Sequence, residues 1–94
     1  QNNNNLPEKF VLMQNYPNPF NPETTINFDL PKNSFVELKI YDINGREVAV
    51  PHSGNLLAGS YELKWSAAGF PSGVYFYRIQ AENFSDTKKM MLIK

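Results

Sequence analysis

The chain has 94 residues, no cysteine, and nine basic against nine acidic side chains. A chain of this length suits one domain rather than two, and without disulfides its stability must come from packing and strand pairing. The balanced charge, with no block of one sign, argues against nucleic acid as a partner, and the apolar runs are too short for insertion into a membrane.

The N-terminal residues are first polar and then apolar. Gln1–Asn5 cannot bury itself and is expected to be disordered, so we predict a polar tail or linker over residues 1–9 and a single domain over residues 10–94. A chain that begins with Gln is what one expects after removal of a signal peptide. The next four residues are apolar and are expected to form a short strand or an extended arm: Phe10, Val11, Leu12 and Met13.

A proline-rich segment, residues 16–22, reads Tyr-Pro-Asn-Pro-Phe-Asn-Pro. Each proline fixes its own φ and moves the preceding residue out of the helical region, so the segment is predicted to be extended or turning, and to form a rigid corner. Prolines also lack the amide donor, so other strands should not pair along this edge.

Short segments that alternate apolar and polar residues predict strands along the rest of the chain. Their ranges are residues 24–30, 35–42, 46–50, 60–66, 72–81 and 87–94. Asn44-Gly45 accepts positive φ and predicts a tight hairpin, while residues 51–59 are predicted as a loop and residues 83–86 as a turn. No segment has helical period. The pattern predicts an all-β fold, an immunoglobulin-like antiparallel β-sandwich of about seven short strands.

The segment with the strongest strand chemistry is residues 72–81. Its period of two places Tyr75, Tyr77 and Ile79 on a core face, and Arg78 and Gln80 on a face that lies partly in water. We predict a central strand here.

Candidate catalytic and ligand sites are weak. Nucleophilic catalysis needs a base beside the nucleophile, but the only histidine, His52, is predicted in a solvated loop. The segment at Asp42 lacks the regular oxygen ligands of a calcium loop and is better interpreted as a hairpin turn. Glu37 and Glu62 fall on outward faces between lysines, which favours surface pairing over glycoside cleavage. We expect no enzyme activity, no metal and no cofactor.

Loop aromatics are a further candidate site, because sugar-binding modules of this architecture use exposed rings. Tyr16, Phe20 and Phe70 could form such a platform. Loop rings also cap the open ends of a thin sandwich core, and this is the favoured interpretation.

Four motifs in a fixed order carry a resemblance to a known family. They are the proline-rich segment, the hairpin at residues 41–48, Gly73-Val74-Tyr75, and the lysines around the apolar C-terminal end. Together, residues 12–94 resemble the C-terminal sorting domain (type A) of type IX secretion substrates. Each motif alone is modest, but their order and hairpin spacing make the resemblance specific. Lys89 and Lys94 are one residue further apart than is usual in the family.

The resemblance implies a non-enzymatic targeting domain of Bacteroidetes-type bacteria, with an immunoglobulin-like fold, at the end of a larger protein. Such domains engage an outer-membrane translocon and are removed by a cell-surface sortase that attaches the cargo to lipopolysaccharide. The implied location is therefore secreted or at the bacterial cell surface, and cleavage is expected within Gln1–Pro7. By position, the implied recognition elements are Pro17, Pro19, Gly73, Tyr75, Lys89 and Lys94.

A second hypothesis applies if these residues are the whole mature protein. Exposed sheet edges and the apolar arm Phe10–Met13 would then suit strand donation between copies, giving a homo-oligomeric extracellular filament or surface layer. A structure in which residues 1–15 pack only on their own sandwich would remove this hypothesis. A carbohydrate-binding module is the third and weakest alternative.

Overall fold

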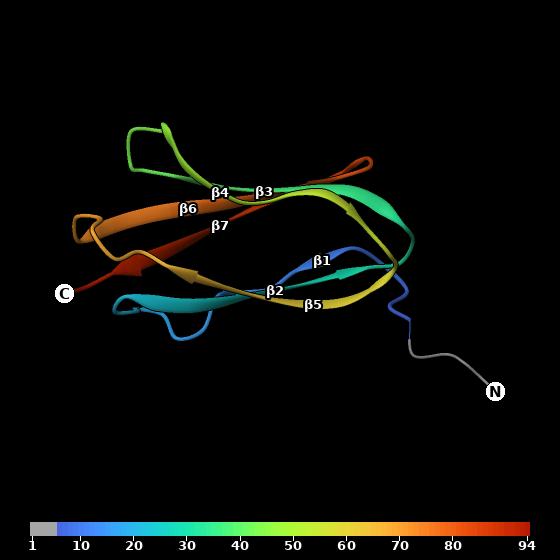
Figure 1. Ribbon diagram of the computed structural model, residues 1–94, viewed down its shortest axis with the longest axis horizontal. Coiled ribbons are helices and arrows are strands. Elements are labelled where there is room, and N and C mark those ends of the chain that lie inside the picture. Colours follow the sequence, from blue (N-terminus) through green and yellow to red (C-terminus); the bar gives the residue numbers. More distant parts are fainter. Residues whose placement is uncertain (1–5) are drawn as a thin grey trace.

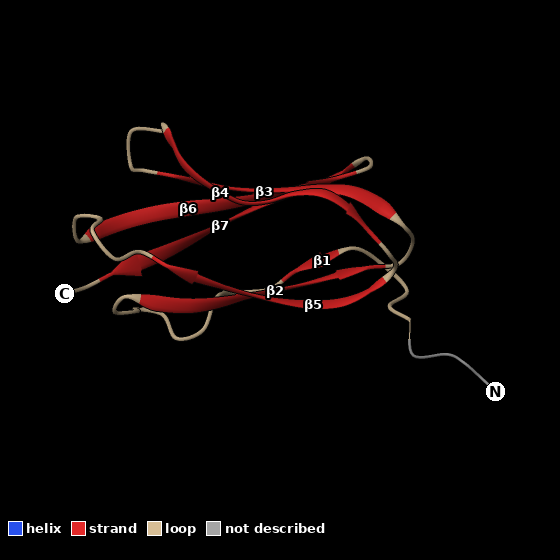
Figure 2. Cartoon of the chain, in the orientation of Figure 1, coloured by secondary structure: helices blue, strands red, loops and turns tan. Residues whose placement is uncertain are grey.

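The computed structural model describes residues 6–94, so the disorder expected at Gln1–Asn5 lies outside the described residues. Seven strands form two antiparallel sheets that face each other (Figures 1 and 2). Their bounds are β1 (Val11–Leu12), β2 (Glu23–Leu30), β3 (Ser34–Tyr41), β4 (Glu47–Leu56), β5 (Gly59–Ser66), β6 (Gly73–Ala81) and β7 (Phe84–Leu92). The predicted all-β sandwich is confirmed.

The strand order within each sheet defines the edges. One sheet has the order β1-β2-β5 and the other β4-β3-β6-β7, so β6 is a central strand, as predicted. A short turn at Leu57–Ala58 joins the edge strands β4 and β5, which run along the same side of the sandwich (Figure 1). The edges on the other side are β1 and β7. Residues 6–94 form no helix that is long and apolar enough to cross a membrane.

Alternate side chains of the strands fill the space between the sheets. The apolar residues predicted to point inward from β2, β3 and β6 are buried: Ile26, Phe28, Leu30, Val36, Leu38, Ile40, Tyr75, Tyr77 and Ile79. Each such side chain contributes about 1.5–3 kcal/mol when it leaves water. The inward residues of β5, Tyr61, Leu63 and Trp65, are only partly buried. Their strand lies at an edge, where no further strand covers them.

Two predicted boundaries were wrong. β4 continues to Leu56, so His52 lies in a strand and not in a solvated loop, and its Nε2 is 3.3 Å from the Gly54 oxygen. The strand tolerates Pro51 because β4 pairs only with β3 and its other side needs no amide donor. β7 begins at Phe84, so the turn before it is residues 82–83 and not residues 83–86.

The β3–β4 hairpin is tight, as predicted, but its turn has a different geometry from the one expected. Gly45 has a φ of 83°, whereas Asn44 does not adopt positive φ. The Gly45 N–H donates to the Asp42 oxygen and the Asp42 N–H donates to the Arg46 oxygen, both at 2.9 Å. This is a turn followed by a glycine bulge, one of the common short hairpin connections.

The apolar arm packs on its own sandwich. Val11 and Leu12 pair with β2, and Leu12 is 3% exposed. The Phe10 ring stacks on Phe84, with 5.4 Å between the ring centroids. Met13 donates its N–H to the main chain of β2 at 3.0 Å. A copy that donated this arm would first have to release it from its own sheet, so this arrangement does not favour strand donation by residues 10–13.

Candidate recognition surface

One end of the sandwich gathers four segments that are far apart in the sequence. Figure 1 places there the proline-rich corner, the β3–β4 hairpin, the β5–β6 loop (residues 67–72) and the chain after β7. The other turns, at residues 31–33, 57–58 and 82–83, lie at the opposite end. Antiparallel strands explain this clustering, because each strand reverses direction and every second connection returns to the same end.

Main-chain hydrogen bonds tie the proline-rich corner to the last strand. The Phe20 N–H donates to the Met91 oxygen, and the Ile93 N–H donates to the Phe20 oxygen, both at 3.0 Å. The Met91 N–H donates to Asn18 Oδ1, also at 3.0 Å. These bonds satisfy main-chain groups on the outer side of β7. The corner therefore covers part of an edge that another chain would otherwise be able to pair with.

A buried polar cluster fixes the start of the corner. The Tyr77 hydroxyl accepts the Asn15 N–H at 2.7 Å and donates to the Met13 oxygen at 2.6 Å. The Asn15 amide donates to Thr24 Oγ1, and Thr24 Oγ1 donates to the Pro17 oxygen, both at 2.9 Å. Burial raises the pKa of Tyr77 to about 12. The phenol therefore stays protonated well into the alkaline range and can serve both of its hydrogen bonds.

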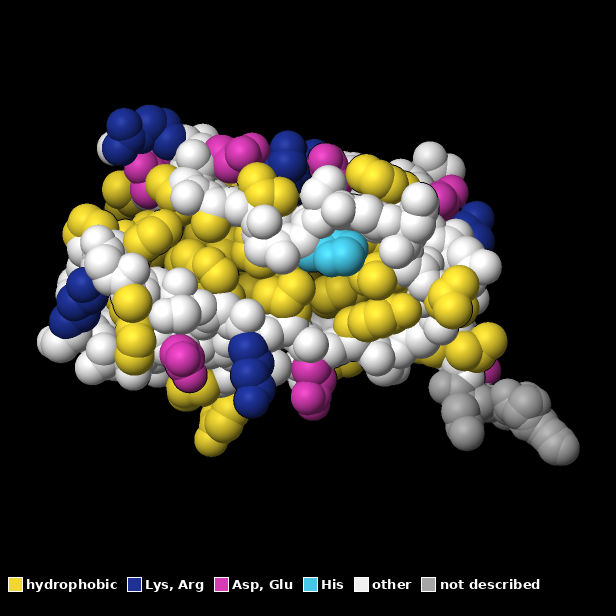
Figure 3. Space-filling view, viewed as in Figure 1, with side chains coloured by type: hydrophobic (Ala, Val, Ile, Leu, Met, Phe, Trp, Pro, Cys, Tyr) yellow, Lys and Arg dark blue, Asp and Glu magenta, His cyan; other side chains and the backbone are white. Residues whose placement is uncertain are grey.

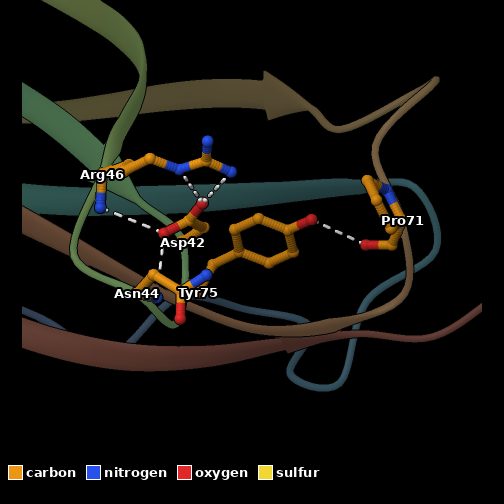
Figure 4. Close-up of polar contacts among 5 residues, drawn as sticks. All are labelled: Asp42, Asn44, Arg46, Pro71 and Tyr75. Atoms are coloured by element: carbon orange, nitrogen blue, oxygen red, sulfur yellow. Dashed lines mark hydrogen bonds and ion pairs between the residues drawn. The ribbon is translucent and has the colours of Figure 1, made fainter.

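An apolar groove of about 460 Å³ lies between the β3–β4 hairpin and the β5–β6 loop. Gly73 and Tyr75, two of the implied recognition residues, line it together with Phe70. The Tyr75 hydroxyl donates to the Pro71 oxygen at 2.7 Å (Figure 4). Burial raises the pKa of Tyr75, and the negative charge of Asp42 adds to the rise. The ring is therefore a neutral, fixed wall of the groove.

A charged hairpin forms the rim of this groove. Asp42 Oδ1 accepts the N–H groups of Asn44 at 2.9 Å and of Arg46 at 3.0 Å (Figure 4). Asp42 Oδ2 accepts Arg46 Nε at 3.1 Å. These hydrogen bonds hold the pKa of Asp42 below its usual value, and the bond from the Arg46 main-chain N–H has the largest effect. The carboxylate closes the turn through N–H donors, which agrees with the interpretation of this segment as a hairpin.

A row of aromatic rings joins the groove to the corner. The centroid of Phe70 lies 5.5 Å from that of Trp65 and 6.0 Å from that of Tyr75, and Trp65 lies 6.1 Å from Phe20. Phe20 is 1% exposed and Phe70 is half-buried, so both cap the core. The alternative hypothesis of a platform of three exposed rings is therefore wrong. Of the three rings, only that of Tyr16, which is 80% exposed, faces solvent.

The six implied recognition residues lie on or beside this end of the molecule. Pro17 and Pro19 are exposed on the corner, and Lys89 and Lys94 are exposed on and after β7. Large exposed apolar side chains lie among them: Tyr16, Ile43, Met91 and Ile93. We call this surface the motif end, and it comprises residues 16–22, 42–46, 67–75 and 89–94.

Sequence reasoning missed the residues that hold the motif end together. Asn15 and Asn18 were not singled out, although one is buried and the other bonds the last strand. One signal was available for the cluster around Tyr77. Thr24 has the parity of the inward residues of β2, and an inward hydroxyl requires a hydrogen-bond partner.

The catalytic candidates do not converge. His52 and Glu37 belong to the four-stranded sheet, whereas Glu62 belongs to the three-stranded sheet. Glu37 Oε1 lies 4.0 Å from Lys39 Nζ, a surface pair of the predicted kind. Within residues 6–94, no three His, Asp or Glu side chains are grouped so that they could hold a metal ion.

The family model described as the secretion system C-terminal sorting domain matches residues 14–94. The chain belongs to this family. The match spans the corner, the hairpin, the groove and β7, so the motif end lies wholly within it. Domains of this family are sorting signals without catalytic activity, and they mark secreted proteins for the type IX machinery. A comparison of this chain with curated proteins found no match.

Proposed function

We propose that the sorting domain is an export signal that the type IX translocon in the outer membrane binds at the motif end. The observation that carries this proposal is the gathering of all four family motifs at one end of the sandwich. In this proposal, Pro17, Pro19, Lys89 and Lys94 contact the translocon directly. Gly73 and Tyr75 shape the groove that receives one of its apolar side chains.

The physical properties of the motif end suit binding without chemistry. Its corner and last strand are held by main-chain bonds, so little conformational freedom is lost when a partner docks. Exposed Tyr16, Ile43 and Ile93 provide apolar area whose burial favours association. The two lysines add positive charge at its border, which speeds encounter with an acidic surface and selects against basic ones.

The linker at the other end suits removal after export. Figure 1 draws residues 6–9 at the end of the sandwich opposite the motif end. Leu6, Glu8 and Lys9 are exposed. A sortase could therefore reach the linker while the translocon still holds the motif end. We propose that cleavage within Gln1–Pro7 releases the domain, and that the cargo is then attached to lipopolysaccharide at the cell surface.

Export of a passive reporter tests this function. The 94-residue chain is fused behind a folded reporter and expressed in a bacterium with a type IX system and in a matched strain that lacks the translocon. We expect the reporter outside the cell only in the first strain, and the processed fraction of it should lack residues 8–94. Equal retention of the reporter in the periplasm of both strains would reject the proposal.

A further inference from the structure

Three of the four sheet edges in the described chain are protected against pairing. β1 has only two residues, and the corner and Gln14 bond the outer side of β7. β4 carries Pro51 and has a shifted register with β3 next to Ile40. Short strands, prolines, bulges and covering segments are the usual means by which proteins block edge-to-edge association.

The fourth edge, β5, has eight residues without proline or bulge. The Ala67 N–H donates to the Pro22 oxygen at 2.9 Å, one step beyond the continuous β2–β5 register. Main-chain groups alternate in direction along a strand, so the odd residues of β5 bond β2 and the even ones point away from it. Ser60, Glu62, Lys64 and Ser66 therefore offer their N–H and C=O groups at the open edge.

The side chains at this edge are self-complementary. We propose that β5 pairs antiparallel with β5 of a second copy around a two-fold axis at Leu63. The even-numbered residues of both copies then form the hydrogen-bonded pairs. Glu62 of each copy therefore lies opposite Lys64 of the other copy. Within residues 6–94 neither side chain forms an ion pair, so both are free for this contact.

Charge also fixes the register of this dimer. Moving the axis to Glu62 would place two glutamates opposite each other, and moving it to Lys64 would oppose two lysines. Like charges directly opposite each other destabilise strand pairing. The axis at Leu63 is therefore the favoured one among the hydrogen-bonding registers near the middle of the strand.

The core side of β5 supports the same contact. The side chains of Tyr61, Leu63 and Trp65 are only partly buried within one copy. Figure 3 shows a band of apolar side chains between the two sheets. A second β5 would cover part of the apolar surface at the edge and would continue the sheet as β1-β2-β5-β5-β2-β1. The motif end takes no part in this contact, so the inference is independent of the proposed function.

Sedimentation of the purified chain from about 1 μM to about 1 mM, the range of weak association, tests the dimer. We expect a monomer–dimer equilibrium. Glu62→Lys and Lys64→Glu should each raise the dissociation constant about tenfold or more, because each reversal turns two attractive pairs into repulsive ones. The double variant with both reversals is again self-complementary and should restore dimerisation. Both positions are exposed, and circular dichroism of each variant verifies folding.

Disulfide trapping tests the register. Residues of a hydrogen-bonded antiparallel pair have Cα atoms about 5.5 Å apart, within disulfide range, and the chain has no cysteine of its own. A mixture of Glu62→Cys and Lys64→Cys chains should form the mixed disulfide in preference to either homodimer. Ser53→Cys on β4 is the control and should not cross-link. A chain that stays monomeric at the highest concentration, a dimer indifferent to the charge reversals, or trapping between identical variants would each overturn the inference.

Discussion

The hydroxyl of Tyr77 provides the most direct test of how the motif end is held together. Tyr77→Phe keeps the buried ring and removes one oxygen. The Asn15 N–H then loses its acceptor at 2.7 Å and the Met13 oxygen loses its donor at 2.6 Å. A buried group left without a partner costs about 1–3 kcal/mol. We expect the free energy of unfolding to fall by about 2–4 kcal/mol, a large share of the stability of a small domain.

Urea unfolding followed by tryptophan fluorescence measures this effect. The transition midpoint should fall while the slope with urea stays constant, because the buried surface is unchanged. Tyr61→Phe is the matched control, since the Tyr61 hydroxyl donates to the Leu57 oxygen at 2.6 Å in an exposed position. The free energy of unfolding of the control should fall by about 0.5 kcal/mol or less. Equal midpoints for Tyr77→Phe and the control would refute the role of the buried cluster.

The remaining predictions concern pH, the corner and one strained turn. The pKa of Tyr77 is about 12 in the folded chain, above the usual 10.0. The neutral phenol therefore makes its full contribution to the free energy of unfolding below pH 10.0, and this contribution is lost as the pH rises toward 12. The free energy of unfolding should therefore decrease by up to about 2 kcal/mol over this pH range. Tyr77→Phe should not show this decrease. Phe20→Ala should cost about 3–5 kcal/mol in urea unfolding, against about 0.5 kcal/mol or less for exposed Tyr16→Ala; similar costs would contradict the docking of the corner. Glu82 has a φ of 56°, which glycine adopts more easily. Glu82→Gly should therefore raise the free energy of unfolding by about 0.5–1 kcal/mol, seen as a higher melting temperature. A lower melting temperature would contradict strain at this turn.

Alternation was sufficient to predict most of the sandwich from the sequence. β2, β3 and β6 each have one predominantly apolar face, and a shift by one residue would have placed that face in water. The prediction was weaker at the edges. β4 has no continuous apolar face that would predict it. It continues through Pro51 because an edge strand needs hydrogen bonds on one side only.

The motif end was harder to predict because its contacts join residues distant in the sequence. Asn18 and Met91 are far apart in the chain, and nothing local to either residue indicates that they bond. The proline pattern predicted a corner at this place in the chain, but it did not indicate that the Phe20 side chain is buried in the core. Tyr77 was placed on the core face by alternation, whereas the two main-chain partners of its hydroxyl became visible only in the fold.

Surface substitutions at the two ends of the sandwich test the central claim most directly. One reporter fusion carries Pro17→Ala, Pro19→Ala, Lys89→Glu and Lys94→Glu, and the control carries Lys32→Glu at the opposite end; all of these positions are exposed. Export into the medium or to the cell surface is measured for both, after their folding has been verified by circular dichroism. Recognition at the motif end predicts loss of export for the first fusion and normal export for the control. Normal export of the first fusion, or equal loss in both, would contradict it.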